Sequence, residues 1–324
     1  MNDFFARIGI DDAPEIWRVN YDAAKASYPE KGPEFLNQKY LYDANELIRL
    51  DADKFDFLLR SAEFFRKSED RSLFVWLWYR CVVMIDNGEK PNVANWPVSE
   101  NFGEYSAMPH AFVLLGMLPR LKEFYREKNI TTDVLTETVS DMNVNMDEHK
   151  SKYGYYGVGA FRYDWLKNHF TGKLFSLGRL QFMHDYFTER TDALTVGDGY
   201  LQVHIPGGGP MTREACLESY DRALPFYKKH FPELEIKAFT CTSWLLSPDI
   251  AALLPPGSNI VRFQNDYTIY ELYDNCYKEV IENVFGSSAA NYEDLPEDTS
   301  LRRAVKARML SGGKIRSGAG YILI

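Results

Sequence analysis

The chain has 324 residues, of which 45% are hydrophobic and 26% are charged, so it can build a large folded core. This composition excludes disordered and collagen-like proteins, and the length predicts two domains. Its 37 basic and 46 acidic residues give a formal net charge of −9. Because a nucleic-acid-binding protein normally carries a basic face, we expect no nucleic-acid partner.

The N-terminal segment and the cysteines indicate a cytoplasmic protein. Acidic residues begin at Asp3, so a basic region followed by an apolar stretch, as in a secretory signal, is not found. The longest apolar runs, Leu73–Tyr79 and Ala111–Leu118, fall well short of the roughly 18–20 residues of a membrane span, so no membrane association is expected. The 4 cysteines are far apart and form no CxxC pair. We therefore expect reduced thiols and no metal.

The sequence pattern of the first half of the chain predicts helices. Apolar residues recur at helical spacing in Phe55, Leu58, Leu59, Ala62 and Phe65. Further helices are expected over 70–85, over 110–128 with a kink near Pro119, and from Thr131 or Thr132 towards His149. Glycine is sparse before residue 150, where we place the domain boundary. Residues 1–150 therefore form a predicted helical N-terminal domain.

The second half predicts a mixed domain over residues 151–324. Strand-like stretches cover 173–184, 200–205, 236–246 and 259–270, and a helix of about 20 residues containing Pro225 lies between the second and third. Strands that alternate with a helix are typical of an α/β or α+β domain. The predicted fold class of the whole chain is α+β.

The segment YLQVHIPGGGPMTR at 200–213 is the most informative part of the sequence. Leu201 and Val203 alternate with polar residues as in a strand, three glycines follow, and Pro210 or Thr212 begins a helix. A strand, a glycine loop and a helix N-terminus together present unpaired N–H groups to an anion. The alternative is a tight turn without a ligand. The segment contains neither a Walker lysine nor a complete GxGxxG.

Three stretches resemble one family when read in order: KLFSLGRLQF at 173–182, VHIPGGG at 203–209, and CTSWLLSP at 241–248 followed by SNI at 258–260. This combination resembles the GNAT-like C-terminal domain of bacterial acyltransferases. Such proteins carry a helical N-acyltransferase-type domain in front. The resemblance covers most of 150–324 and extends to the first half only through its helical character.

The resemblance implies an acyl-coenzyme A-dependent acyltransferase that acts on an amine of a small molecule or peptide. In GNAT enzymes the loop after the fourth strand binds the coenzyme pyrophosphate, and the thioester lies against a splayed strand pair, here 200–205 and 236–246. A backbone N–H of the fourth strand stabilises the oxyanion. The residues expected at the coenzyme are Gly207, Gly208, Gly209, Met211, Thr212 and Arg213.

The chain departs from the GNAT pattern at two points. The usual loop reads Arg or Gln, two residues, Gly, one residue, Gly or Ala, which HIPGGGP does not match. GYYGVG at 154–159 and RSGAG at 316–320 come closer, but at other places in the chain. The segment after the strand at 236–246, SPDIAALL, contains no tyrosine to protonate the leaving thiolate. A non-catalytic GNAT-like protein that binds a ligand or peptide is therefore the main alternative.

His204, Cys241 and Ser243 are the candidate catalytic residues. Cys241 and Ser243 share one face of their strand. If His204 lies on the same side, it is a general base for the amine, or a partner of Cys241 in a cysteine-dependent acyltransferase or hydrolase. The alternatives are a buried histidine bonded to a carbonyl and a small core cysteine.

Two further features leave alternatives open. Arg179, next to Gly178, is a partner for a carboxylate, either of a ligand or in a structural salt bridge. The segment 301–316 holds six basic residues and no acid, and it is either a solvated helix face or an anion site, for example for the 3′-phosphate of the coenzyme. The oligomeric state is left open.

Overall fold

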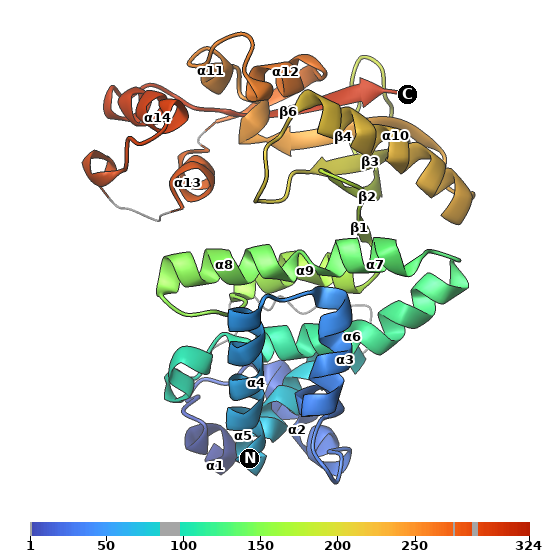
Figure 1. Ribbon diagram of the computed structural model, residues 1–324, viewed down its shortest axis with the longest axis vertical. Coiled ribbons are helices and arrows are strands. Elements are labelled where there is room, and N and C mark those ends of the chain that lie inside the picture. The colour runs from blue at the N-terminus through green and yellow to red at the C-terminus, as the bar shows by residue number, and fades with distance from the viewer. Residues whose placement is uncertain (1, 85–97, 275, 287–290) are drawn as a thin grey trace. The chain divides into compact units, whose positions relative to one another are not determined.

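A computed structural model describes residues 2–84, 98–274, 276–286 and 291–324. The chain forms two compact units, and the division in the sequence falls between Lys173 and Leu174 (Figure 1). The predicted boundary at residue 150 instead falls inside α8 (Met142–Tyr153). The first unit extends further because the next helix, α9 (Ala160–Phe170), packs against α6 (Met108–Glu127).

The first unit is helical throughout its described residues. Its other helices are α1 (Asn2–Arg7), α2 (Glu15–Ala26), α3 (Gln38–Ile48), α4 (Ala52–Arg66), α5 (Glu69–Tyr79) and α7 (Thr132–Val139), with short turns η1 (Glu34–Leu36), η2 (Arg80–Met84) and η3 (Glu100–Tyr105). The helices predicted around 55–65 and 110–128 are confirmed, and the one over 70–85 is confirmed up to Met84 as α5 followed by η2, while residue 85 lies outside the described residues. The helix expected from Thr131 or Thr132 to His149 is two helices, because α7 ends at Val139 and α8 begins at Met142.

Aromatic side chains fill the core of this unit. Trp17 and Trp78 are fully buried, with ring centroids 5.6 Å apart, and Phe74 meets the Trp17 ring edge-on at 5.4 Å. Phe65 packs edge-on against Phe112 at 5.8 Å. Such rings bury about 150–250 Å² each, so they supply much of the apolar area that stabilises the helices.

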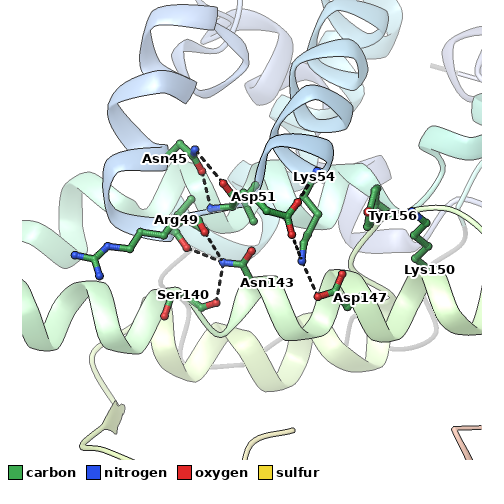
Figure 2. A network of polar contacts seen from close by, with 11 residues as sticks. Asn45, Arg49, Asp51, Lys54, Ser140, Asn143, Asp147, Lys150 and Tyr156 are labelled. Atoms are coloured by element: carbon green, nitrogen blue, oxygen red, sulfur yellow. Dashed lines mark hydrogen bonds and ion pairs between the residues drawn. The ribbon is translucent and has the colours of Figure 1, made fainter. Parts of the chain in front are cut away.

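A buried lysine joins α4 to α8. The side chain of Lys54 is only 4% exposed, and its Nζ lies 2.7 Å from Asp51 and 2.6 Å from Asp147 (Figure 2). Asp51 also caps α4 by accepting the Lys54 N–H at 3.1 Å. Burial lowers the pKa of Lys54, but the bonds from Asp147 and Asp51 outweigh that effect, so the net shift is upward. The ammonium group therefore stays charged inside the helical unit.

An asparagine amide fixes the turn between α3 and α4. Asn143 Nδ2, on α8, donates to the carbonyls of Ile48 at 2.9 Å and Arg49 at 3.0 Å (Figure 2). Arg49 ends α3 in the left-handed conformation, with a φ of 55°. Because helix-terminal carbonyls have no partner within the helix, the Asn143 amide satisfies groups that would otherwise be unpaired.

The second unit is built on one mixed sheet. Its strands are β1 (Leu174–Ser176), β2 (Gln181–Tyr186), β3 (Gly199–His204), β4 (Ile236–Ser243), β5 (Thr268–Tyr273) and β6 (Ser317–Leu323), in the order β1-β2-β3-β4-β6-β5. The β3–β4 pair is parallel and the other pairs are antiparallel. The expected α+β class is confirmed.

The sheet differs from the sequence predictions mainly in three stretches. The stretch 173–184 is a hairpin rather than one strand, because Gly178, with a φ of 94°, lies in the turn between β1 and β2. The stretch 259–270 begins as helix α12 (Asn259–Asn265), which Ser258 caps, and only its end belongs to β5. The glycine-rich stretch around 316–320 is largely strand β6, which the sequence did not predict.

Helix α10 (Arg213–His230) covers one face of the sheet (Figure 1). Tyr220 packs against Phe182 of β2 and Phe239 of β4, with centroids 6.1 and 4.8 Å apart. Tyr227 Oη donates to the carbonyl of Phe182 at 3.0 Å. These contacts explain why the apolar stripe of α10 is buried even though Pro225 interrupts its hydrogen-bond ladder.

The remaining helices follow β4 in the chain. They are α11 (Pro248–Ala251), α13 (Tyr277–Val280) and α14 (Ser300–Leu310), with the short turns η4 (Trp244–Leu246), η5 (Ile281–Phe285) and η6 (Tyr292–Asp294). A second apolar cluster, which includes Ile250, Val280, Val305 and Met309, lies among them.

Candidate active site

The parallel ladder between β3 and β4 opens partway along the two strands. Its last pair is Gln202 with Thr240. Beyond this point β3 continues alongside β2, where His204 pairs with Gln181, and β4 continues alongside β6, where Ser243 pairs with Gly318. Because each strand follows its outer neighbour, the pair splays and its backbone groups leave the shared ladder. This is the pair for which the family resemblance implied a splay.

The glycine loop follows directly after the splayed end of β3. Gly208 and Gly209 have φ values of 78° and 74°, in the left-handed region that favours glycine. Helix α10 then begins at Arg213, and Thr212 caps it by accepting the Ala215 N–H at 3.3 Å. The predicted cap is therefore confirmed at Thr212. The first-turn N–H groups of the helix have no carbonyl four residues earlier in the helix to accept them.

Arg179 holds this loop from the β1–β2 turn. Its Nη1 donates to the carbonyl of Pro206 at 3.0 Å, its Nε to that of Pro210 at 3.3 Å, and its Nη2 to that of Gly209 at 3.4 Å. The sequence pointed to a carboxylate partner, and the guanidinium instead binds three loop carbonyls. Burial lowers the pKa of Arg179.

Arg213, expected at the coenzyme, is bound within the protein. Its Nη1 lies 2.5 and 2.7 Å from the two carboxylate oxygens of Asp266. Asp266 follows α12, so the ion pair ties the start of α10 to the segment that leads into β5. The sequence did not predict this pair, because its two residues are 53 positions apart.

The β3–β4 register places His204 and Cys241 on opposite faces. Paired residues of neighbouring strands point to the same side, so Gln202 and Thr240 share a face, and His204 shares it with them. Cys241 lies on the face of Phe239, which α10 covers. The condition that His204 and Cys241 share a face is therefore not met, and these residues do not form a nucleophilic pair.

The chemistry of Cys241 and Ser243 fits this placement. Cys241 is 1% exposed, and burial raises the pKa of its thiol to about 12, so the thiolate is scarce at neutral pH. The hydroxyl of Ser243 accepts the Leu245 N–H at 3.1 Å and thereby caps η4. Burial of the thiol and the capping bond of the hydroxyl argue against either residue as a nucleophile. His204 is half-buried and lies opposite Gln181, whose Nε2 donates to Ser176 Oγ at 3.2 Å.

The face under α10 holds a polar pair that sequence analysis missed. The hydroxyls of Tyr220 and Tyr267 lie 2.7 Å apart, and both side chains are buried. Burial raises the pKa of both groups. Tyr220 was interpreted as core from its place on the helix stripe, whereas Tyr267 carries no local signal because its partner is 47 residues away.

The basic residues of 301–316 are satisfied within the protein. Arg316 binds Asp249 through Nε and Nη2 at 2.9 Å each, and its N–H donates to the same carboxylate at 3.0 Å. This arrangement lowers the pKa of Asp249. The other cations in the segment bind nearby acids or carbonyls, namely Arg302 to Asp298, Arg303 to the Glu297 carbonyl, Lys306 to Glu297, Arg308 to Asp249 and Lys314 to Asp274. These contacts favour the interpretation of the segment as a helix face over its interpretation as an anion site.

The described ranges contain neither a membrane-spanning helix nor a group of metal ligands. No described helix combines the length and the apolar character needed to cross a bilayer. Within residues 2–84, 98–274, 276–286 and 291–324, no three or more His, Cys, Asp or Glu side chains are grouped so as to hold a metal ion.

Both units match known domain families. Residues 174–322 match the GNAT-like C-terminal domain, and residues 39–172 match the N-acyltransferase N-terminal domain. The chain therefore belongs to the family that joins these two domains, as the sequence resemblance indicated. No curated protein matches the chain.

Solved structures share this fold over nearly the whole chain. A crystal structure of an acyltransferase in complex with decanoyl-CoA and teicoplanin is 23% identical, with a TM-score of 0.82, and the match covers 99% of this chain and 98% of that one. A mutant acyltransferase in complex with octanoyl-CoA is 22% identical, with a TM-score of 0.81 and coverage of 100% and 99%. An acyltransferase in complex with decanoyl-CoA is 24% identical, with a TM-score of 0.78 and coverage of 99% and 98%.

Proposed function

We propose that this protein transfers an acyl group from acyl-coenzyme A to an amine. The opening of the β3–β4 ladder after Gln202 and Thr240 carries the proposal, since it lies directly before the glycine loop. The thioester arm would lie along the opened strands. The pyrophosphate would accept hydrogen bonds from N–H groups of the loop and of the first turn of α10. The structural neighbours in complex with acyl-CoA support this choice of donor.

The coenzyme site would consist of the loop and the helix start. Gly207, Gly208, Gly209 and Met211 would contribute backbone N–H groups, as would Thr212 and Arg213. The side chain of Arg213 would act indirectly, because it already binds Asp266. A helix N-terminus stabilises an anion by roughly 0.3–1 kcal/mol at an exposed site, so several N–H groups are needed for useful affinity.

In the transfer itself, the amine nitrogen attacks the thioester carbonyl carbon. A tetrahedral oxyanion forms, and a backbone N–H of β3 released by the splay would stabilise it. The carbon–sulfur bond then breaks, the amide forms and coenzyme A leaves as the thiolate. His204 is the proposed base that takes the proton from the amine, directly or through water. Holding both reactants in one site supplies much of the remaining rate enhancement.

The proposed acceptor is a small molecule or peptide that presents a free amine. A structural neighbour is in complex with both decanoyl-CoA and teicoplanin, which supports an acceptor larger than a simple metabolite.

Calorimetry and mass spectrometry test the proposal together. We expect the purified protein to bind decanoyl-CoA or octanoyl-CoA, and to acylate at least one member of an amine panel that includes teicoplanin. Each transfer should release one equivalent of free thiol. The proposal fails if neither long-chain acyl-CoA nor acetyl-CoA binds.

A binding protein without catalysis is the second candidate. It is favoured by the segment after β4, where Ser247–Leu254 contains no tyrosine to protonate the thiolate. Such a protein would bind acyl-CoA tightly, yet release no thiol beyond the rate of spontaneous hydrolysis with any amine of the panel.

A further inference from the structure

The side chain of Arg179 reaches across the glycine loop and contacts it at three points. The three carbonyls that accept its N–H groups belong to Pro206, Gly209 and Pro210, on either side of the left-handed turn. A guanidinium has five N–H donors in a rigid plane, so one side chain can bind several acceptors in a defined geometry. Arg179 therefore determines which way these peptide groups point.

The orientation of the carbonyls decides where the N–H groups point. In a trans peptide, the N–H points opposite to the carbonyl of the preceding residue. Because the carbonyls of Pro206 and Pro210 turn towards Arg179, the N–H groups of Gly207 and Met211 turn away from it. The negative ends of these two peptide dipoles are thus held at a cation, and their positive ends are left for an anion.

The position of Arg179 is itself fixed against α10. Its neighbour Leu180 donates its N–H to Ser219 Oγ at 3.2 Å, and that hydroxyl donates to the carbonyl of Ala215 at 2.8 Å. A Cβ on Gly178 would come within 2.9 Å of Ser219 Oγ, so glycine permits this close approach. The hairpin turn and the first turns of α10 are therefore held together, with the loop between them.

Arg179 has no carboxylate partner in the described part of the chain, and its described hydrogen bonds all go to the three loop carbonyls. It therefore keeps a net positive charge behind the loop. Arg213, by contrast, is neutralised by Asp266.

From these contacts we infer that Arg179 is a positioning residue for the phosphate end of the coenzyme. It orients the loop N–H groups and adds an uncompensated positive charge, but it does not touch the thioester. This inference rests on the proposed function. It extends that function by assigning the loop orientation to a residue of the β1–β2 turn, outside the loop sequence.

The test compares two ligands that differ only at the phosphate end. Decanoyl-CoA carries the pyrophosphate and the 3′-phosphoadenosine, whereas S-decanoyl-pantetheine keeps the thioester and its arm but lacks both. Arg179→Gln should weaken decanoyl-CoA binding by about tenfold or more, because hydrogen bonds to charged groups contribute roughly 1.5–3 kcal/mol. Binding of S-decanoyl-pantetheine, measured by displacement of a fluorescent acyl ligand, should change by less than about twofold.

Two further variants serve as controls. Arg179→Lys keeps the charge but cannot bind three carbonyls, so its loss of decanoyl-CoA affinity should be intermediate. Arg18→Gln removes a half-buried arginine of the other unit, whose Nε donates to the Ala13 carbonyl at 2.9 Å, and it should leave both affinities unchanged. Thermal unfolding of each variant reports on its folding.

The outcomes separate the two proposals. If the wild-type protein binds neither ligand, this inference fails, and the proposed function fails as well if octanoyl-CoA and acetyl-CoA do not bind either. If the wild type binds and Arg179→Gln retains the full decanoyl-CoA affinity, only the role of Arg179 is overturned. An equal loss of affinity for both ligands in a folded Arg179→Gln protein also overturns the role of Arg179, because that result indicates a general structural role.

Discussion

His204 and Cys241 lie on opposite faces of the sheet, although each follows the last pair of the β3–β4 ladder. The side chain of Cys241 is enclosed beneath α10, where Phe239 packs against Tyr220. The two residues therefore do not act as a pair, and single substitutions can test each of them separately.

Replacing Cys241 with alanine should leave acyl transfer within about twofold of wild type, because a buried thiol is normally a core group. The free energy of unfolding should fall by roughly 1 kcal/mol through the lost packing. Iodoacetamide at pH 8 should label this cysteine only after unfolding, since burial raises its pKa to about 12. Loss of transfer in a folded Cys241→Ala protein would instead support cysteine-dependent catalysis.

Replacing His204 with glutamine should lower the rate of transfer by about 10²-fold, the lower end for a general base. The affinity for decanoyl-CoA should stay unchanged, because the side chain is assigned to the amine. His184→Gln is the matched control, since His184 lies on the neighbouring strand β2, pairs with Leu201 and faces the other side of the sheet. Equal rates in the two variants would remove His204 from the proposed mechanism.

Replacing Gly208 or Gly209 with alanine should destabilise the loop by about 1–2 kcal/mol, because a left-handed φ is unfavourable for a residue with a Cβ. The affinity of these variants for decanoyl-CoA should fall as well. Asparagine at the same positions should be tolerated better. Gly257→Ala, at a glycine without a positive φ, should change neither quantity. Full affinity in Gly208→Ala and Gly209→Ala would show that the loop does not bind the coenzyme.

The two ion pairs of Lys54 lead to a prediction about the stability of the helical unit. Asp51→Asn or Asp147→Asn alone should lower the free energy of unfolding only slightly, because the other carboxylate still pairs with the lysine. The double variant leaves a buried ammonium unpaired and should lose about 3 kcal/mol or more in the free energy of unfolding. Urea unfolding of the four proteins measures this difference as a double-mutant cycle. The prediction would be contradicted if the stability lost in the double variant equalled the sum of the losses in the two single variants.

The pH dependence of this site has a definite sign. Hydrogen bonds from Lys54 hold the pKa of Asp51 below its usual range. A carboxyl with a depressed pKa in the folded protein contributes stability above its unfolded pKa, and that stability is lost as the pH falls through the folded value. Wild-type protein should therefore lose stability in acid more steeply than Asp51→Asn, as denaturant unfolding between pH 6 and pH 3 would show.

Local patterns in the sequence were sufficient for the features that depend on neighbouring residues. Helical spacing predicted α4, and Thr212 could be identified as a cap because its hydroxyl reaches an N–H only three residues away. The glycine loop was found in the same way, since left-handed turns need glycine. Its place between a strand and a helix followed from the alternation before it and the polar, capped segment after it.

Other features depended on partners far along the chain. The glycines of β6 suggested a loop, but Gly318 lies where a Cβ would come within 2.3 Å of the Leu246 carbonyl oxygen, so close packing between segments requires it. The bond between Tyr220 and Tyr267 and the pairing of Arg213 with Asp266 both join distant segments.

The length and charge of the chain predicted two domains and argued against a nucleic-acid partner, and the sequence alone led to the glycine loop and to the family. Only the tertiary structure decided which residues meet there. A shift of one residue in the β3–β4 register would have placed His204 beside Cys241, because strand side chains alternate between faces. The pairing of Gln202 with Thr240, and the three carbonyls that turn towards Arg179, are properties of the folded sheet.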